Sequence, residues 1–220
     1  MVFILALARE LRIIQWVKNL AIFTAIIFGG QLFNPELFKI SLVAFVSFSL
    51  LSSGGYIIND IADLSHDRAH PVKKYRPLAR GLISQPLISL IGAGLIFSAL
   101  YLAFSITASF FLLSIFYIIL QFFYATVFKN MAILDILVIA AGYFLRVLGG
   151  ELATGFHISV WLILTAISLS LFLAIGKRRA ELTLLAGTEQ YQKIRQSLSH
   201  YSERLLDQYL AVFMAATFIS

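Results

Sequence analysis

The sequence predicts an all-α protein, a polytopic bundle of about seven membrane-spanning helices that forms a single domain over residues 1–220. Its composition is the first support: 60% of the residues are hydrophobic and 13% are charged, whereas soluble domains are nearer half apolar and a quarter charged. The apolar residues also gather in runs, and a helix needs about 20 such residues to cross a bilayer. Finally, the basic residues collect between alternate runs, as they do in membrane proteins.

Seven apolar runs define the predicted helices. They cover residues 18–33, 38–58, 86–104, 108–127, 131–150, 158–176 and 205–220. The first run is short and begins with polar residues. The last stays apolar up to Ser220 without a charged flank, so we expect that the last helices of a longer bundle are missing. The sequence has no cysteine, which excludes disulfides and thiolate metal sites. Its first ten residues do not resemble a cleaved signal peptide.

Lys and Arg lie almost entirely on one side when the runs are threaded alternately through a bilayer. That side holds about 15 of the 17, namely Arg9, Arg12, Lys18, Arg68, Lys73, Lys74, Arg76, Arg80, Lys129, Lys177, Arg178, Arg179, Lys193, Arg195 and Arg204. Cytoplasmic loops are enriched in Lys and Arg, so we expect this side in the cytoplasm. The net charge of +6 then reflects topology, and we expect no nucleic-acid partner.

The most densely charged stretch follows the second run and reads N-D-I-A-D-L-S-H-D-R-A-H-P-V-K-K-Y-R-P, residues 59–77. If the second run continues as a helix, Asp60, Asp63 and Asp67 fall on one face. Such carboxylates repel one another unless a cation lies between them, and Mg²⁺ is usually held by a few carboxylates together with substrate phosphates. A solvated helix end is the alternative. Because the stretch lies at the mouth of a membrane helix and a basic segment follows, we favour a Mg²⁺ site for a diphosphate.

The basic segment begins within this stretch. It comprises His66, Arg68, His70, Lys73, Lys74, Arg76 and Arg80. Pro71 and Pro77 restrict the backbone on both sides of themselves, which predicts a shaped loop. Arg and Lys both suit phosphate oxygens. The alternative is an anchor that contacts lipid headgroups, which fits Lys73 or Lys74 individually but explains the interleaved acids and bases less well.

A second charged patch ends the sixth run, at A-I-G-K-R-R-A-E-L, residues 174–182. On a helix, Lys177 and Arg178 would present a cationic face together with the Glu181 carboxylate. An ordinary basic stop after a membrane span is the alternative. If tertiary packing brings this patch opposite Asp60 and Asp63, the two patches would bind one polyphosphate between them.

Polar residues also occur within the runs. The first opens with Q-W-V-K-N, in which Lys18 and Asn19 suit either a substrate contact or an interfacial anchor. Asp135 and Arg146 are eleven residues apart in the fifth run, on nearly the same helical face, and charged residues inside a membrane indicate function by default. Helix-packing contacts are expected at Gly92, Gly94, Gly149 and Gly150.

The pattern N-D-x-x-D-x-x-x-D, complete here as Asn59, Asp60, Asp63 and Asp67, resembles the first aspartate-rich motif of the UbiA-type intramembrane prenyltransferases. The stretch Q-W-x-K-N and the continuation D-R-A-H-P-x-K-x-x-R-P-x-A-x-G, residues 67–81, are similar to that family as well. The resemblance covers essentially the whole chain. It implies a UbiA-type bundle, which typically has nine helices.

The stretch from Gly176 to Leu182 narrows the resemblance. Members that attach prenyl groups to aromatic rings carry a second aspartate-rich motif there. Here the stretch reads G-K-R-R-A-E-L and resembles the G-K-R-x-A-E-L of the decaprenyl-phosphate phosphoribosyltransferase branch. L-D-I near Asp135 and L-R-V-x-x-G around Arg146 are also similar to this branch. The branch commonly has Tyr where this chain has Arg179, so a contact made by that ring is not carried over.

The resemblance implies a Mg²⁺-dependent transferase in the cytoplasmic (inner) membrane of a bacterium, acting in cell-wall precursor biosynthesis. It would move 5-phosphoribose from phosphoribosyl pyrophosphate to a polyprenyl (decaprenyl) phosphate, giving polyprenylphosphoryl-5-phosphoribose. The 5-phosphate of that donor suits a cationic second motif. The alternative is a UbiA-type transfer of a prenyl group from a prenyl diphosphate to an aromatic or other acceptor. A transporter or channel is disfavoured, because the polar residues gather at helix ends rather than at the bilayer midplane.

These motifs define the expected site. Asp60, Asp63 and Asp67 would hold Mg²⁺, and together with Asn59 they form the catalytic set. The expected substrate-binding residues are Lys18, Asn19, Lys73, Arg76, Arg80, Arg146, Lys177, Arg178 and Glu181. The expected partners are phosphoribosyl pyrophosphate, a polyprenyl phosphate lipid and the bilayer, and an oligomer is compatible with them.

Overall fold

The computed structural model of the chain is built from helices, which confirms the predicted fold class. It describes residues 2–69, 72–185 and 201–220, and no β-strand occurs in these ranges. The chain divides into two compact units. Unit 1 comprises residues 1–126 and 146–157, and unit 2 comprises residues 127–145 and 158–220. Helix α7 (Leu134–Thr154) belongs to both, with its first part in unit 2 and its last part in unit 1.

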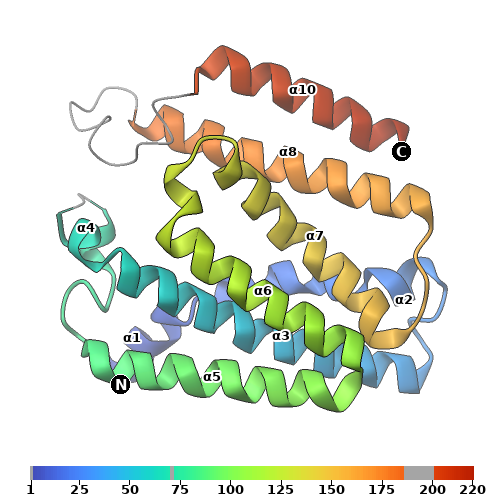
Figure 1. Cartoon of the computed structure of the whole chain (residues 1–220), viewed down its shortest axis with the longest axis horizontal. Coiled ribbons are helices and arrows are strands. Elements are labelled where there is room, and N and C mark those ends of the chain that lie inside the picture. Colours follow the sequence, from blue (N-terminus) through green and yellow to red (C-terminus); the bar gives the residue numbers. More distant parts are fainter. Residues whose placement is uncertain (1, 70–71, 186–200) are drawn as a thin grey trace. The chain divides into compact units, whose positions relative to one another are not determined.

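Helix α3 organises unit 1. Besides the end of α7, the unit contains α1 (Val2–Glu10), η1 (Ile13–Phe23), α2 (Thr24–Phe28), α3 (Pro35–Ala62), α4 (Leu64–Ala69), η2 (Lys73–Tyr75), α5 (Gln85–Ile106) and α6 (Ala108–Thr126). Helix α3 packs against α5, α6 and η1. Figure 1 shows α5 running alongside α3.

Local sequence features explain where α3 begins, and its length explains how far it reaches. The Asn34 side chain accepts hydrogen bonds from the backbone N–H groups of Glu36 and Leu37 at 3.1 and 3.4 Å. Pro35 occupies the first turn, where a missing N–H costs little. The helix has 28 residues and ends at Ala62. At about 1.5 Å per residue it is longer than a hydrocarbon core of about 30 Å, so its acidic end reaches the membrane surface.

One face of α3 is polar although most of that face is buried. The stripe consists of Ser49, Ser52, Ser53, Tyr56 and Asp60. The 3₁₀ segment η1 covers part of it: Asn19 Nδ2 donates to Ser49 Oγ at 3.0 Å, and Trp16 Nε1 donates to Ser53 Oγ at 3.0 Å. Ser53 Oγ in turn donates to the carbonyl oxygen of Leu11 at 2.8 Å. These hydrogen bonds hold the N-terminal segment of the chain against α3.

Glycines allow close helix packing in unit 1. A Cβ atom at Gly150 would lie 2.0 Å from the backbone oxygen of Ile22, and one at Gly92 would lie 3.0 Å from the Ile57 side chain. Gly149 has ordinary contacts, the nearest to Phe110. Gly94 has no neighbour within 4 Å of such an atom, so the packing role predicted for it is wrong.

Unit 2 contains η3 (Phe128–Asn130), the first part of α7, α8 (Val160–Leu185) and α10 (Glu203–Ile219). Helix α10 lies along α8, as Figure 1 shows. Ser202 caps α10 by accepting a hydrogen bond from the N–H of Leu205 at 3.2 Å. Apolar residues of the helices form the core, including Ile136, Ile175 and Leu206.

Five helices of the described ranges are long and apolar enough to cross a membrane: α3, α5, α6, α7 and α8. A sixth span results if α1 and the η1–α2 segment, which meet at a bend of 41°, count as one. The predicted seven differ at the chain ends. The first predicted run comprises the end of the 3₁₀ helix η1, the short helix α2 and the turns that follow, and the last corresponds to α10, which has 17 residues.

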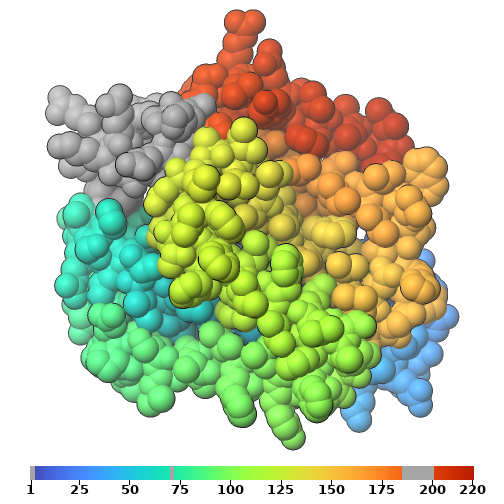
Figure 2. Space-filling view, in the orientation of Figure 1, coloured from blue at the N-terminus to red at the C-terminus, as the bar shows by residue number. Residues whose placement is uncertain are grey.

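Apolar side chains cover the outside of these helices. On α5, Leu90, Phe97, Tyr101 and Phe104 are each about 70% exposed, and bulky side chains project from this helix in Figure 2. A soluble protein rarely exposes so large an apolar surface, whereas lipid chains accept it. Together with the apolar spans, this surface identifies an integral membrane protein.

Candidate active site

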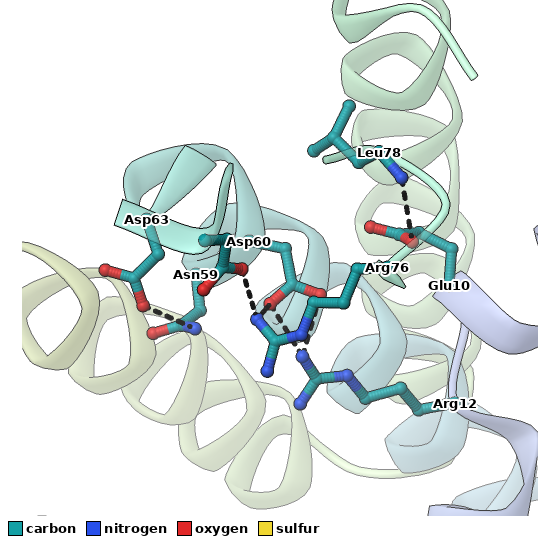
Figure 3. A network of polar contacts seen from close by, with 8 residues as sticks. Glu10, Arg12, Asn59, Asp60, Asp63, Arg76 and Leu78 are labelled. Carbon is teal, nitrogen blue, oxygen red and sulfur yellow. Dashed lines mark hydrogen bonds and ion pairs between the residues drawn. The ribbon is translucent and has the colours of Figure 1, made fainter. Parts of the chain in front are cut away.

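Asp60, in the last turn of α3, is 3% exposed and contacts two arginines. Nη2 of Arg12 donates to both carboxylate oxygens, at 2.6 and 2.7 Å. Nη1 of Arg76, which follows η2, donates to Asp60 Oδ1 at 2.8 Å. Figure 3 shows both guanidinium groups at this carboxylate. The acidic end of α3 is therefore neutralised by two distant segments of the chain.

Asp67, on the short helix α4, shares one of these arginines. Its Oδ2 lies 2.5 Å from Arg76 Nη1, the same nitrogen that contacts Asp60. Burial raises the pKa of Asp67 above its usual range, and Arg76 opposes this effect. Lys73 also acts electrostatically on Asp67. One cationic nitrogen thus bridges two buried carboxylates, as a bound metal ion would.

Asp63 caps the C-terminal end of α3 and is partly buried. Nδ2 of Asn59 donates to its Oδ2 at 3.2 Å. The helix ends before Asp63, and Asp67 lies on α4, so the carboxylates do not form one continuous helical stripe. In the described part of the chain, no three acidic or histidine side chains are placed to hold a metal ion together. The assignment of Mg²⁺ to these carboxylates stays a prediction.

The donor set nevertheless has the chemistry that Mg²⁺ requires. Asp60, Asp63 and Asp67 offer carboxylate oxygens and Asn59 an amide oxygen, and hard divalent cations take oxygen ligands. The position of Arg76 Nη1 between Asp60 and Asp67 shows that a positive charge fits between these two carboxylates. We conclude that the residues present fit a divalent cation.

The remaining predicted cationic residues of unit 1 vary in exposure. Lys73 in η2 and Lys18 in η1 are partly buried, and Arg80 is exposed. The backbone N–H of Arg80 donates to the carbonyl oxygen of Arg76 at 2.9 Å, which places the two in one turn. His70 and Pro71 of the basic segment lie outside the described residues.

A second polar network lies deeper in unit 1, around Arg146 on α7. Arg146 is 5% exposed. Its Nε donates to Asn19 Oδ1 at 2.6 Å, and its Nη2 donates to the Tyr117 hydroxyl at 3.3 Å. Its guanidinium also lies 5.6 Å from the centre of the Tyr117 ring, within cation–π distance. Two of the predicted substrate-binding residues, Asn19 and Arg146, are therefore in direct contact.

The second charged patch belongs to unit 2, where Arg178 on α8 is 0% exposed. Its Nε lies 2.6 Å from Asp135 Oδ2, and its Nη1 donates to Glu181. The Tyr201 hydroxyl donates to Asp135 Oδ1 at 2.7 Å and accepts a hydrogen bond from the N–H of Ile133 at 2.5 Å. Burial, together with the bond to Asp135, raises the pKa of Tyr201. Arg178 is thus part of a buried cluster that joins α7, α8 and Tyr201, which precedes α10.

The neighbours of Arg178 are more accessible. Lys177 is exposed, and the Glu181 side chain is 24% exposed. Arg179 Nε contacts Asp207 Oδ1 on α10 at 2.7 Å, and its Nη1 lies 3.2 Å from Glu203. Arg179 therefore links α8 to α10, at a position where the decaprenyl-phosphate phosphoribosyltransferase branch commonly has Tyr. Whether the Lys177 patch faces the Asp60 cluster stays a prediction, and Lys193 and Arg195 lie outside the described residues.

Several residues of these clusters were not predicted as site residues. The charge distribution predicts Arg12 only as a cytoplasmic charge, and no predicted motif includes Glu10, Tyr117 or Tyr201. One sequence pattern indicates which face of α3 these residues contact. The polar residues of the α3 stripe, between Ser49 and Asp60, recur at helical spacing within an apolar run. Arg12 and Tyr201 offer no such pattern, because their partners are 48 and 66 residues away.

The apolar spans, together with an aspartate cluster at one end of a membrane helix, define a polytopic membrane protein with a charged site. The chain belongs to the UbiA prenyltransferase family, whose family model matches residues 20–181. This result confirms the resemblance found in the sequence.

Two curated relatives carry the same name. The decaprenyl-phosphate phosphoribosyltransferase of Mycolicibacterium smegmatis is 35% identical over 205 residues, which cover 91% of this chain and 64% of the relative. The protein of that name from Corynebacterium glutamicum is 36% identical over 202 residues, covering 90% of this chain and 60% of the relative. The chain therefore spans less than two thirds of the length of these relatives.

Solved structures support the same fold. A UbiA homologue from Archaeoglobus fulgidus, bound to DMAPP and Mg²⁺, is similar with a TM-score of 0.76 over 97% of this chain and 75% of that one, at 20% sequence identity. A digeranylgeranylglyceryl phosphate synthase structure gives a TM-score of 0.75 at 17% identity, covering 100% of this chain and 76% of that one. At these identities the likeness establishes the fold alone.

Proposed function

We propose that the protein is a Mg²⁺-dependent transferase that moves 5-phosphoribose from phosphoribosyl pyrophosphate to a polyprenyl phosphate such as decaprenyl phosphate. The product would be polyprenylphosphoryl-5-phosphoribose. The similarity to two relatives named decaprenyl-phosphate phosphoribosyltransferase supports this choice of substrates. We also propose that the enzyme lies in the inner membrane of a bacterium, with its charged connections in the cytoplasm.

The observation that carries the proposal is the pair of buried carboxylates, Asp60 and Asp67, held together by one nitrogen of Arg76. Buried carboxylates are costly without a positive partner. A site of this kind, at the end of a membrane helix, suits a cation that carries a diphosphate into the protein. A solvated helix end would not bury its carboxylates.

The proposed metal ligands are Asp60, Asp63 and Asp67, with Asn59 orienting Asp63 through its side-chain hydrogen bond. When bound, Mg²⁺ would supply positive charge to the departing diphosphate. Lys73, Arg76 and Arg80 lie on the connection beside these carboxylates and would bind phosphate oxygens through charge-assisted hydrogen bonds. Lys18 would line the adjoining part of the site, and the buried pair of Asn19 and Arg146 would support that part through its hydrogen bond.

The second patch would bind the other anionic groups. Lys177 is exposed and would contact a phosphate directly, either the 5-phosphate of the donor or the lipid phosphate. Arg178 has no exposed surface, so it would act by holding Glu181 and Asp135 in place. This division follows from burial, because the Arg178 side chain is 0% exposed whereas the Arg76 side chain, although also paired with two carboxylates, is 26% exposed.

The transfer itself needs no strong base. The bond between C1 of ribose and the pyrophosphate oxygen breaks, and the pyrophosphate leaves with the electron pair. C1 becomes oxocarbenium-like, as in glycoside chemistry, and an oxygen of the lipid phosphate forms the new bond from the opposite face. That oxygen is already anionic at neutral pH, so no proton is transferred. The residues of the chain contribute by binding, orienting and neutralising charge.

The second candidate is transfer of a prenyl group from a prenyl diphosphate to an aromatic or other acceptor. Membership of the UbiA prenyltransferase family favours it. The same carboxylates would serve, because both donors carry a diphosphate. The basic patch around Lys177 argues against it, since a prenyl diphosphate has no second anionic end to bind there.

A labelled-substrate assay tests the proposal. Purified protein is incubated with radiolabelled phosphoribosyl pyrophosphate and polyprenyl phosphate, with Mg²⁺ or with EDTA. We expect a labelled lipid that forms only with Mg²⁺. Product from a prenyl diphosphate and an aromatic acceptor, with none from the sugar donor, would establish the second candidate instead. Solute flux into liposomes without any modified lipid would indicate a transporter.

A further inference from the structure

Arg12 makes contacts that its place in the sequence does not explain. It lies in the two-residue connection between α1 and η1, outside the aspartate motif and the basic segment. Its Nη2 contacts both oxygens of Asp60, and its guanidinium lies 4.6 Å from the centre of the Tyr56 ring. Asp60 and Tyr56 are one helical turn apart on the polar stripe of α3. Arg12 therefore covers the acidic end of that stripe.

The backbone at Arg12 adopts an uncommon conformation. Its φ and ψ angles are 51° and 46°, in the left-handed region. A non-glycine residue is uncommon there, and such strain concentrates at functional sites. The chain bends by 41° between α1 and the η1–α2 segment, and Arg12 lies in this bend.

One carboxyl group beside Arg12, that of Glu10, is not fully satisfied. Glu10 is 2% exposed, and it is close enough to Asp60, Arg12 and Arg76 to interact with all three electrostatically. Its Oε2 accepts one long hydrogen bond, from the N–H of Leu78 at 3.4 Å, and its Oε1 is buried without a hydrogen-bond partner. Figure 3 shows Glu10 near the two arginines. Buried polar atoms without partners are uncommon, and this one indicates that the cluster has capacity for a further positive group.

Electrostatics limits what can join the cluster. A divalent cation at Asp60 would lie close to two guanidinium groups, and like charges at such distances repel strongly in a partly buried site. When a diphosphate arrives with the cation, the interaction with the two guanidinium groups becomes attractive, because the diphosphate oxygens accept hydrogen bonds from them. The arginines thus oppose the metal alone and favour the metal with pyrophosphate.

We propose that Arg12 neutralises Asp60 in the substrate-free protein and moves to the diphosphate of the donor when the metal–diphosphate complex binds. Arg12 would then be a specificity-determining residue that couples metal binding to donor binding. The inference rests on the proposed function, since it assumes a metal–diphosphate donor. It adds to that function a residue outside the expected site and an order of binding.

Calorimetry on the detergent-solubilised protein tests the inference with Mg²⁺ alone and with inorganic pyrophosphate in excess Mg²⁺. In Arg12→Gln we expect Mg²⁺ alone to bind about threefold more tightly or better, because a repelling charge is gone. We expect Mg²⁺–pyrophosphate to bind about tenfold more weakly, because a charge-assisted hydrogen bond is lost. A purely structural role for Arg12 would weaken both.

Two further variants complete the test. Arg9→Gln removes the same charge from an exposed position on α1 and should leave both affinities unchanged. Arg12→Lys keeps the charge but loses the planar guanidinium, so it should repel Mg²⁺ as the wild type does and bind Mg²⁺–pyrophosphate with intermediate affinity. It also serves if Arg12→Gln does not fold.

The outcomes separate the inference from the proposed function. Suppose that the wild-type protein binds Mg²⁺–pyrophosphate but Arg12→Gln shifts both affinities in the same direction. This result would overturn the inference and leave the proposed function standing. The same holds if Arg12→Lys binds Mg²⁺ alone more tightly than the wild type. Wild-type protein that does not bind Mg²⁺–pyrophosphate at all would overturn the proposed function and the inference with it.

Discussion

Charged residues in this protein are distinguished by what contacts them. Asp60 and Asp67 are buried and share Arg76, whereas Asp63 is partly buried and accepts a hydrogen bond from Asn59. The cost of changing each side chain therefore differs, even though the three share one sequence motif. Buried charges that lose a partner destabilise a protein strongly, and exposed ones do so little.

The first prediction uses this difference. Asp60→Asn should abolish transfer from labelled phosphoribosyl pyrophosphate. It should also lower the free energy of unfolding by roughly 2 kcal/mol, because two guanidinium groups lose their carboxylate. Asp63→Asn should abolish transfer at nearly wild-type stability. Thermal unfolding in detergent, beside the transfer assay, measures both effects, and wild-type turnover in either variant would remove the metal assignment.

The second prediction concerns the buried pair of Arg178 and Asp135. Arg178→Met should destabilise the protein by about 3 kcal/mol, since Asp135 is left buried without its cation. Asp135→Leu combined with Arg178→Met should recover part of this loss, because an apolar pair can replace a buried ion pair. The melting temperatures of the two variants provide the comparison. If the double variant is less stable than Arg178→Met, the structural role assigned to this pair is wrong.

The environments of single residues are the least predictable from the sequence. The motif identified Asp60, Asp63 and Asp67 as candidates, and their separate environments came only from the fold. Arg178 shows the limit clearly: a basic residue after a membrane span suggests a solvated or phosphate-binding group, yet its side chain is 0% exposed. Its partner Asp135 is 43 residues away on another helix, and no local pattern specifies such a contact.

At the scale of elements, close helix packing depends on particular glycines. Gly150 on α7 faces the backbone of η1, where Asn19 contacts Arg146. A side chain there would push apart the two segments that carry this buried network. Gly94 on α5 points into open space and provides a matched control on another membrane helix.

The third prediction follows from this contrast. Gly150→Ala should lower the free energy of unfolding by about 2 kcal/mol or more, because its Cβ would overlap a backbone oxygen that cannot move away by rotating a side chain. Gly94→Ala should leave it unchanged or raise it slightly, because Ala is the better helix former. Thermal unfolding of the two variants measures the difference. Equal midpoints would contradict the close contact between α7 and η1.

The elements themselves were largely predictable. The cores of α3, α5, α6, α7 and α8 match the predicted apolar runs, since burial in lipid requires long apolar helices. The N-terminal run differs from the prediction, because its residues form the end of the 3₁₀ helix η1 and the short helix α2 rather than one long helix. Asn19 in this run donates to Ser49 on α3, and apolar periodicity does not reveal such a contact.

At the scale of the whole molecule, the distribution of Lys and Arg predicts which ends of the membrane helices lie in the cytoplasm. The two ends of α3 differ: Ser65 lies just beyond its charged end, and Glu36 lies in the first turn at the other end. The helix is long enough to place them on opposite sides of a membrane. The charged end is proposed to be cytoplasmic.

The fourth prediction tests this orientation. The sequence contains no cysteine, so single cysteines can be introduced without a background. In intact cells, Glu36→Cys should react with a membrane-impermeant thiol reagent, whereas Ser65→Cys should react only after the membrane is permeabilised. Both positions are exposed, so burial does not bias the comparison. The opposite labelling pattern would reverse the proposed topology.

The sequence by itself determined that this is a helical membrane protein of the UbiA family with an aspartate motif at the end of one helix. It could do so because membrane burial, helix capping and short motifs depend on residues close together in the chain. Only the tertiary structure decided which charges meet: Arg12 and Arg76 at Asp60, Asn19 at Arg146, and Arg178 at Asp135. Such contacts join distant segments, and their energies depend on burial and distance, which exist only after the chain has folded.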